Sequence, residues 1–162
     1  MPKRLVVLAL LLAPCMPGAA VAVDLHAYWD DRCKECHDDA GAFARRTLRV
    51  EDGRLVGAHH REDLGRFLHQ HYLADDLVAP VTAMLIAQAT TTPLFKSHCA
   101  ACHGDAAALA RKSLVLKDGV LTGKVSGRPV SDFLRTHGGL APGEIPAMTA
   151  TLQRVLGEVG AR

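Results

Sequence analysis

The chain has 162 residues, a formal net charge of +2, nine histidines and seven Phe, Trp and Tyr residues in total. Its basic residues form no stripe with interleaved aromatic residues, which excludes a typical nucleic-acid-binding protein. No segment reaches the ~20 consecutive apolar residues that span a bilayer, so stable membrane insertion is not expected.

Residues 1–22 are predicted to be a cleaved signal peptide. They begin with a positively charged region, continue with a short apolar run and end in the small-x-small pattern Ala20-Val21-Ala22. Cleavage near Ala22 would release the protein into the periplasm. Acylation of Cys15 would instead make a lipoprotein, but the proline directly before it disfavours that processing.

Four elements are expected in the first part of the mature chain. They are a helix over residues 25–46, a hairpin over 47–57, and helices over 61–72 and 76–89. The hairpin is predicted from loose alternation on both sides of Asp52-Gly53, a dipeptide typical of two-residue hairpin turns.

The same elements are predicted a second time, because a shift of 66 residues aligns the sequence with itself without a gap. The shift pairs, among others, Cys33 with Cys99, Cys36 with Cys102, His37 with His103, Phe67 with Phe133 and His71 with His137. The second copy predicts a helix over 93–112, a hairpin over 113–123, and helices over 129–137 and 144–159. A boundary at the polar, proline-ended segment 90–93 divides the chain into domains 23–90 and 91–162.

Each copy contains a Cys-x-x-Cys-His motif, the pattern to which haem is covalently attached. The two thiols can add to the two vinyl groups of one porphyrin, and the histidine that follows is placed to bind the iron. A copy of about 70 residues has a thin apolar core, which a buried macrocycle would complete. We therefore expect two haem c groups. One is held by Cys33, Cys36 and proximal His37, the other by Cys99, Cys102 and proximal His103.

Two other uses of the four motif cysteines stay open. Cysteines of exported proteins often form disulfides, and four thiolates can hold one zinc ion. Disulfides leave the equivalent positions of His37 and His103 unexplained. A zinc site requires the two motifs to come together.

The order of elements resembles the class I cytochrome c fold. In that fold a helix with the Cys-x-x-Cys-His motif is followed by a loop, a middle helix and a C-terminal helix packed across the first. The resemblance implies a mostly α fold with two tandem cytochrome c-like domains. The small β-hairpin expected after each haem helix is not part of the minimal class I core, so the resemblance is to a divergent branch.

The opposite side of each iron has two candidate sets of ligands. His71 and His137 follow a phenylalanine by four residues, so a phenylalanine packed on the haem would aim the histidine inward. A helix C-terminus also favours histidine, through its dipole. Met84 and Met148 are the alternative, although they differ in register by two positions and core packing explains them. We expect His71 and His137 to be the distal ligands.

The sequence also predicts where three further side chains lie relative to the haem. His69 is expected to face away from the haem if His71 faces it. Arg45 and Arg111, which are equivalent and follow the haem helix, are expected either to pair with a haem propionate or to lie at a solvated helix end.

The ligand set selects among electron transfer, gas binding and catalysis. An iron with six ligands from porphyrin and protein has no place for a substrate, so we expect an electron carrier and not an enzyme. Its partners would be redox proteins, an electron donor and an acceptor, met through small transient contacts. The alternative is a small dihaem enzyme, or a gas or redox sensor, with one open or labile iron site.

Overall fold

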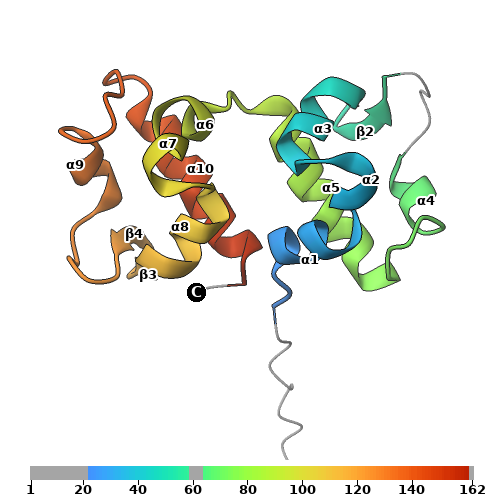
Figure 1. The fold of residues 1–162 in the computed structure, drawn as a ribbon, viewed down its shortest axis with the longest axis horizontal. Helices are drawn as coiled ribbons and strands as arrows, with labels where there is room; N and C mark the ends of the chain where they lie inside the picture. The colour runs from blue at the N-terminus through green and yellow to red at the C-terminus, as the bar shows by residue number, and fades with distance from the viewer. Residues whose placement is uncertain (1–21, 59–63, 161–162) are drawn as a thin grey trace, which may run out of the picture.

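The computed structural model describes residues 22–58 and 64–160 (Figure 1). Nearly all of the predicted signal peptide, with Cys15, lies outside the described residues, and so does the start of the helix expected over 61–72. The described chain is mostly helical and contains two antiparallel hairpins, as the sequence predicts. None of its helices combines the length and apolar character needed to cross a membrane.

The two copies of the repeat have the same order of elements. In the first half, residues 23–90, these are α1 (Leu25–Arg32), α2 (Lys34–His37), α3 (Ala40–Thr47), β1 (Leu48–Glu51), β2 (Arg54–Gly57), α4 (Leu64–Leu68) and α5 (Asp75–Thr90). In the second half, residues 91–162, they are α6 (Leu94–His98), α7 (Ala100–His103), α8 (Ala106–Ser113), β3 (Leu114–Lys117), β4 (Val120–Gly123), α9 (Val130–Leu134) and α10 (Ile145–Glu158). The halves lie side by side along the long axis, with α4 and α9 at opposite ends (Figure 1).

The helices expected over 25–46 and 93–112 are wrong as continuous elements, because each is divided into three short helices. The main break follows the motif histidine, where Asp38 and Gly104 have φ angles of 61° and 71°. A residue in this left-handed region ends a helix. Asp39 and Asp105 then cap the next helix by accepting backbone hydrogen bonds of 2.8 and 2.7 Å. Each motif histidine is therefore the last residue of its own short helix.

Both predicted hairpins are confirmed, and they pair in equivalent registers. Asp52-Gly53 and Asp118-Gly119 have positive φ angles at both residues, as a type I′ turn requires. The second strand of each hairpin buries one leucine, Leu55 or Leu121, in the core of its half. The hairpin thus contributes to the core as well as connecting helices.

The helices expected to end at Tyr72 and His137 are shorter than predicted. α4 ends at Leu68 and α9 at Leu134, so His71 and His137 lie in the turn that follows each helix. Tyr72 and Gly138, which come directly after the two histidines, have φ angles of 55° and 85° and do not continue a helix.

The last helix of each half, α5 or α10, is confirmed to within one residue of its predicted ends. Each packs at the centre of a separate apolar core. The first core contains Leu25, Trp29, Ala40, Ala44, Leu48, Leu55, Leu77, Val81, Met84 and Leu85. The second contains Phe95, Ala107, Ala110, Leu114, Leu121, Val130, Leu134, Met148, Leu152, Val155, Leu156 and Val159. Among the described residues, neither core includes a residue of the other half.

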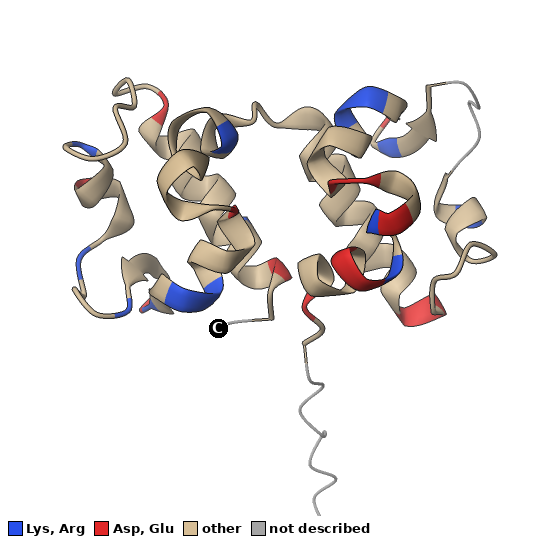
Figure 2. Cartoon of the chain, in the orientation of Figure 1, with Lys and Arg blue, Asp and Glu red and all other residues tan. Residues whose placement is uncertain are grey.

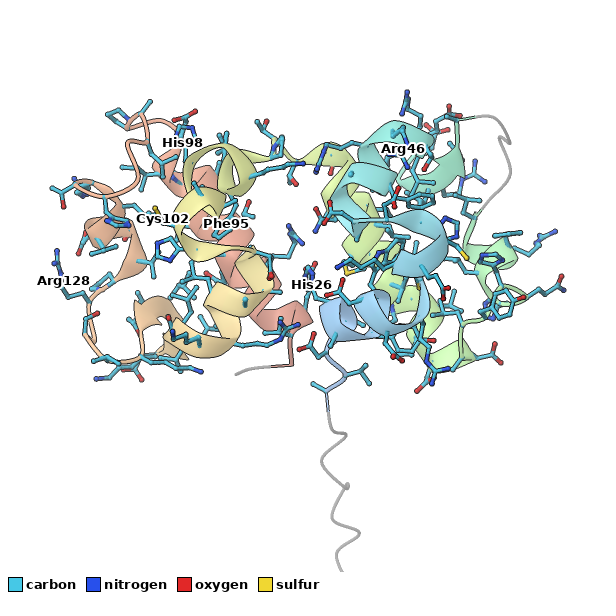
Figure 3. All side chains as sticks on the ribbon, viewed as in Figure 1. His26, Arg46, Phe95, His98, Cys102 and Arg128 are labelled. Atoms are coloured by element: carbon cyan, nitrogen blue, oxygen red, sulfur yellow. The ribbon has the colours of Figure 1, made fainter. Side chains whose placement is uncertain are left out.

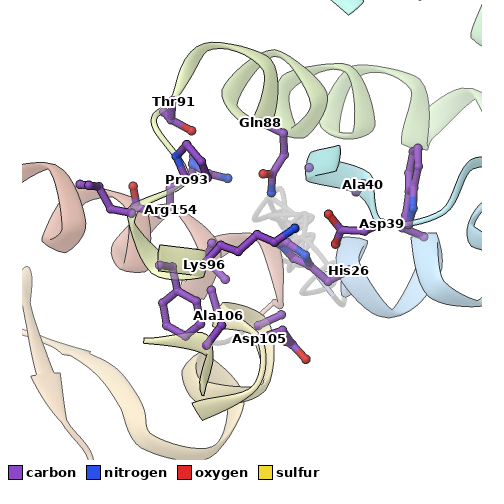
Figure 4. A pocket seen from close by; sticks show the side chains of 18 of the residues that line it. His26, Asp39, Ala40, Gln88, Thr91, Pro93, Lys96, Asp105, Ala106 and Arg154 are labelled. Carbon is purple, nitrogen blue, oxygen red and sulfur yellow. The ribbon is translucent and has the colours of Figure 1, made fainter. Parts of the chain in front are cut away.

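Polar contacts join the two halves. The Arg111 guanidinium of α8 donates hydrogen bonds of 2.6 and 3.0 Å to the Asp24 carboxylate. His26 of α1 contacts the Glu158 carboxylate of α10 at 2.8 Å. A pocket of about 330 Å³ is lined by polar and apolar residues of both halves, His26 among them (Figure 4).

Replacing Asp24 with Asn is expected to destabilise the protein at neutral pH but not in acid. Burial raises the pKa of Asp24, but hydrogen bonds from Arg111 and from the Ala27 amide outweigh burial and hold the pKa below its ordinary value of 3.8. The ionised group therefore stabilises the folded state above that ordinary value, and the stabilisation is lost as the pH falls through the folded pKa.

The expected loss in the free energy of unfolding is about 0.5–1 kcal/mol near pH 7, because both partners are partly exposed and screened by solvent. Asparagine keeps the oxygen that caps the helix, so the change removes the charge and the acceptor of one Arg111 hydrogen bond. Chemical denaturation of both proteins at about pH 7 and about pH 2 checks this expectation. An equal difference between the proteins at the two pH values would contradict it.

Candidate functional site

An apolar cavity lies between α2 and α4 in the first half. Its volume of about 630 Å³ lies within the roughly 300–1,000 Å³ that is typical of ligand and cofactor pockets. Its lining contains the motif residues, the predicted distal ligand and apolar side chains: Cys33, Cys36, His37, His71, Trp29, Phe43, Leu55, Phe67, Val81 and Leu85.

An equivalent cavity of about 400 Å³ lies between α7 and α9 in the second half. Its lining includes Cys99, Cys102, His103, His137, Phe95, Leu109, Leu114, Val130, Phe133 and Leu152. Figure 3 shows Phe95 and Cys102 in this half, and Arg128 at its outer edge. In each half, the structure therefore brings together the four residues that the sequence assigns to one haem.

Within each cavity, the two predicted iron ligands face each other. The ring centroids of His37 and His71 are 5.9 Å apart, and those of His103 and His137 are also 5.9 Å apart. Two imidazole nitrogens that bind one metal ion from opposite sides, at about 2 Å each, place their ring centroids roughly 6 Å apart. The spacing in both halves suits one iron ion between the rings.

The motif histidine is held by the helix that contains it and by aromatic neighbours. The His37 amide donates a 2.9 Å hydrogen bond to the Cys33 carbonyl, which fixes the histidine relative to the motif. The Phe43 ring packs on the imidazole with centroids 4.5 Å apart. Trp29 holds the backbone directly after His37, because its indole N–H donates a 2.9 Å hydrogen bond to the Asp38 carbonyl. In the second half, His103 makes the same amide bond to Cys99.

The distal histidines are positioned by the phenylalanines that precede them by four residues. The Phe67 and His71 rings are 4.6 Å apart, and the Phe133 and His137 rings are 4.5 Å apart. The two rings of each pair are therefore in contact, although the pair spans a helix end and the following turn. The same stacking in both halves aims both histidines into their cavities.

The electrostatics of the site favour neutral ring and thiol groups. Burial lowers the pKa of His37, and the nearby His71 lowers it further. Burial also raises the pKa values of the Cys33 and Cys99 thiols. Neutral imidazole is the form that binds a metal ion. All four motif cysteines are free thiols in the structure.

The alternative methionine ligands lie elsewhere. Met84 is 1 % exposed and Met148 is fully buried, each within the apolar core of its half. Neither methionine lines the cavity of its half. Packing against α3 and α8 therefore accounts for both side chains, whereas His71 and His137 face the motif histidines.

The remaining charged candidates make contacts outside the cavities. His69 contacts Asp75 at 2.8 Å and does not line the first cavity, as expected. Arg45 donates to the Gln88 carbonyl, and Arg111 donates to the Asp24 carboxylate. Neither arginine lines the first or the second cavity, although Arg45 lines the pocket between the halves.

Pairing with a haem propionate was one of the two positions expected of Arg45 and Arg111, but two other arginines line the cavities. Arg32 lines the first cavity and Arg128 lines the second. A haem propionate in either cavity could pair with the guanidinium that lines that cavity. The repeat gives no signal for them, because the residues equivalent to Arg32 and Arg128 are His98 and Glu62.

The geometry also bears on the zinc alternative. Cys33 and Cys36 line one cavity, whereas Cys99 and Cys102 line the other. Residues 22–58 and 64–160 contain no group of three or more His, Cys, Asp or Glu side chains placed to hold a metal ion by themselves. A porphyrin supplies four iron ligands, so a pair of protein ligands suffices for haem.

Comparisons of the chain with protein-family models, with curated proteins and with solved structures found no match.

Proposed function

We propose that this protein is an exported dihaem c-type cytochrome that carries electrons between redox proteins, with each half acting as one cytochrome c-like domain. The observation that carries the proposal is the pair of facing histidines, 5.9 Å apart in both halves, inside apolar cavities that also hold both motif cysteines. Local disulfides give no role to these histidines.

Each residue has a defined part in this proposal. Cys33, Cys36, Cys99 and Cys102 would fix two haems through thioether bonds. His37 and His103 would bind iron from the proximal side, and His71 and His137 from the distal side. When bound, each haem would supply exchange of one electron between ferric and ferrous iron.

The cavity lining explains why this site would carry electrons and not convert a substrate. Phe43 and Phe67 pack on the two histidines of the first cavity, and apolar residues of the hairpin and α5 form its walls. If His37 and His71 both bound the iron of the first haem, and His103 and His137 that of the second, a substrate oxygen or a gas would have no free position at either iron. Histidine in place of a thioether ligand gives a lower reduction potential than His/Met ligation.

Export to the periplasm belongs to the same proposal. The pattern in residues 1–22 supports it, and the cleavage pattern at Ala20-Val21-Ala22 precedes α1 by only a few residues. The expected mature protein starts near Val23 and keeps the whole of both cavities.

Carbon monoxide tests the proposal directly. The reduced protein is mixed with the gas, and the Soret band is followed by stopped-flow absorbance. We expect no shift on the timescale of mixing, because both irons have two histidine ligands. A fast shift of half of the absorbance would contradict the electron-carrier function. It would favour a sensor or enzyme in which one iron has an open or easily displaced ligand position.

A further inference from the structure

The two candidate sites face opposite ends of the molecule. One cavity lies between α2 and α4 and the other between α7 and α9, and Figure 1 places α4 and α9 at the two ends of the long axis. The other sides of α2 and α7 face each other, because Lys34 and Ala100 both line the pocket between the halves. Two partners could therefore contact the two sites at the same time.

The two halves carry opposite net charges. Residues 23–90 contain 8 Lys and Arg against 12 Asp and Glu, a net charge of −4, whereas residues 91–162 contain 9 against 5, a net charge of +4. Figure 2 shows acidic residues on α1, α2 and the start of α5, and basic residues along the outer loops of the second half. Two haems would change both halves equally and leave this difference intact.

Three of the nine basic residues of the second half lie just before α9 or directly after it: Lys124, Arg128 and Arg135. Arg128 lines the cavity and lies over the Phe133 ring, 5.8 Å from its centroid. Lys124 and Arg135 lie on the chain segments on either side of it, and both are exposed. The Lys124 ammonium donates a 2.6 Å hydrogen bond to the Arg111 carbonyl, and Arg135 lines a separate pocket beside α10. Asp132 is the acidic member of this group, 3.7 Å from Arg135, and it leaves an excess of positive charge.

Apolar side chains are exposed within the same group. Val125 is completely exposed and Phe133 is 42 % exposed. The residues that the repeat places opposite Lys124 and Arg135 in the first half are Ala58 and His69, so the first cavity lacks these two cations. An exposed apolar centre with a charged rim is the usual form of a transient docking surface.

We propose that the outer surface of the second half, with a basic rim formed by Arg128 at the cavity and by Lys124 and Arg135 on the segments beside it, docks an acidic electron-transfer protein. The proposal rests on the proposed electron-carrier function and names the partner of one of its two sites. Opposite potentials on two proteins accelerate their encounter and set their orientation.

The first test maps the charged surfaces without any redox reaction. Hexacyanochromate(III), a redox-inert paramagnetic trianion, is added to the ¹⁵N-labelled purified protein, and broadening of amide signals is recorded. Tris(ethylenediamine)chromium(III), a trication, is used in parallel. We expect the anion to broaden signals around residues 124–135 and the cation to broaden signals of α1 and α2. Equal broadening of both ends by the anion would overturn the proposal.

The second test uses an acidic redox protein, a reduced plant-type [2Fe–2S] ferredoxin. One electron leaves the ferredoxin cluster and is taken up by the oxidised protein, and no bond forms or breaks. The double variant Lys124→Glu/Arg135→Glu is expected to react about tenfold more slowly at low ionic strength, and the difference should shrink as salt is added. The control Arg46→Glu/Arg54→Glu makes the same change in net charge on the first half, and should keep the wild-type rate within about twofold.

Each outcome separates this proposal from the proposed function. If no haem is bound, ferredoxin oxidation fails for every variant, while the chromium probes still report the charged surfaces. If haem is bound and ferredoxin reacts as slowly with the control as with the rim variant, the docking surface is refuted. The proposed electron-carrier function then still stands. Sedimentation that shows self-association of the protein, abolished by salt and by Lys124→Glu/Arg135→Glu, would also overturn it, because the rim would then bind a second copy of this chain.

Discussion

Replacing His71 with alanine is expected to convert one of the two irons from low-spin to high-spin and to open it to carbon monoxide. The His71 imidazole faces His37 with ring centroids 5.9 Å apart. Met84, the alternative distal ligand, does not line that cavity. Replacing His137 should have the same effect on the other iron, and the two effects should add, because each histidine lines only its own cavity. Absorbance and electron paramagnetic resonance of the oxidised protein measure the spin state.

Two matched controls make this prediction specific. His69 is only two residues from His71 but contacts Asp75 outside the cavity, so His69→Ala should leave both irons low-spin. Met148→Leu should also leave them low-spin, since Met148 is packed in the apolar core. A spin change in Met148→Leu, or none in the His71 and His137 variants, would show that the distal ligands are assigned wrongly.

Replacing Cys99 and Cys102 with alanine is expected to remove covalent haem from the second half and to unfold much of that half. A unit of about 70 residues gains only a few kcal/mol from its apolar core. Losing a buried macrocycle would therefore cost more than the free energy of unfolding of that half. The cavity of about 400 Å³ would be left open among apolar side chains. Circular dichroism and the haem-to-protein ratio measure the two effects.

The mirror variant in the first half supplies the control. Cys33→Ala/Cys36→Ala should lose the other haem and leave the second half folded, because each apolar core is formed by residues of its own half. Each variant should therefore keep half of the haem content. Unchanged haem content in both variants would contradict the role of the motif cysteines.

The sequence was sufficient for features that depend on local pattern and on the repeat. The hairpins follow from Asp-Gly in two equivalent places, and the last helices begin and end within one residue of their predicted bounds. The four-residue spacing of Phe67 and His71 places their rings in contact, although it spans the end of α4.

Features that depend on backbone conformation or distant contacts were not predictable. Asp38 is not a glycine, yet it adopts a left-handed conformation that ends α2, which a residue-type rule does not foresee. The partner of Arg111 is Asp24, 87 residues earlier, so no local pattern reveals their ion pair. Arg32 and Arg128 reach the cavities from positions that the repeat does not match.

The most direct test of the whole account is the mass of the denatured protein, expressed together with a bacterial machinery for c-type cytochrome maturation. The account predicts a polypeptide starting near Val23 that retains two covalently attached haems after unfolding and removal of free porphyrin. A mass equal to that of the polypeptide alone, with or without two disulfides, would contradict it.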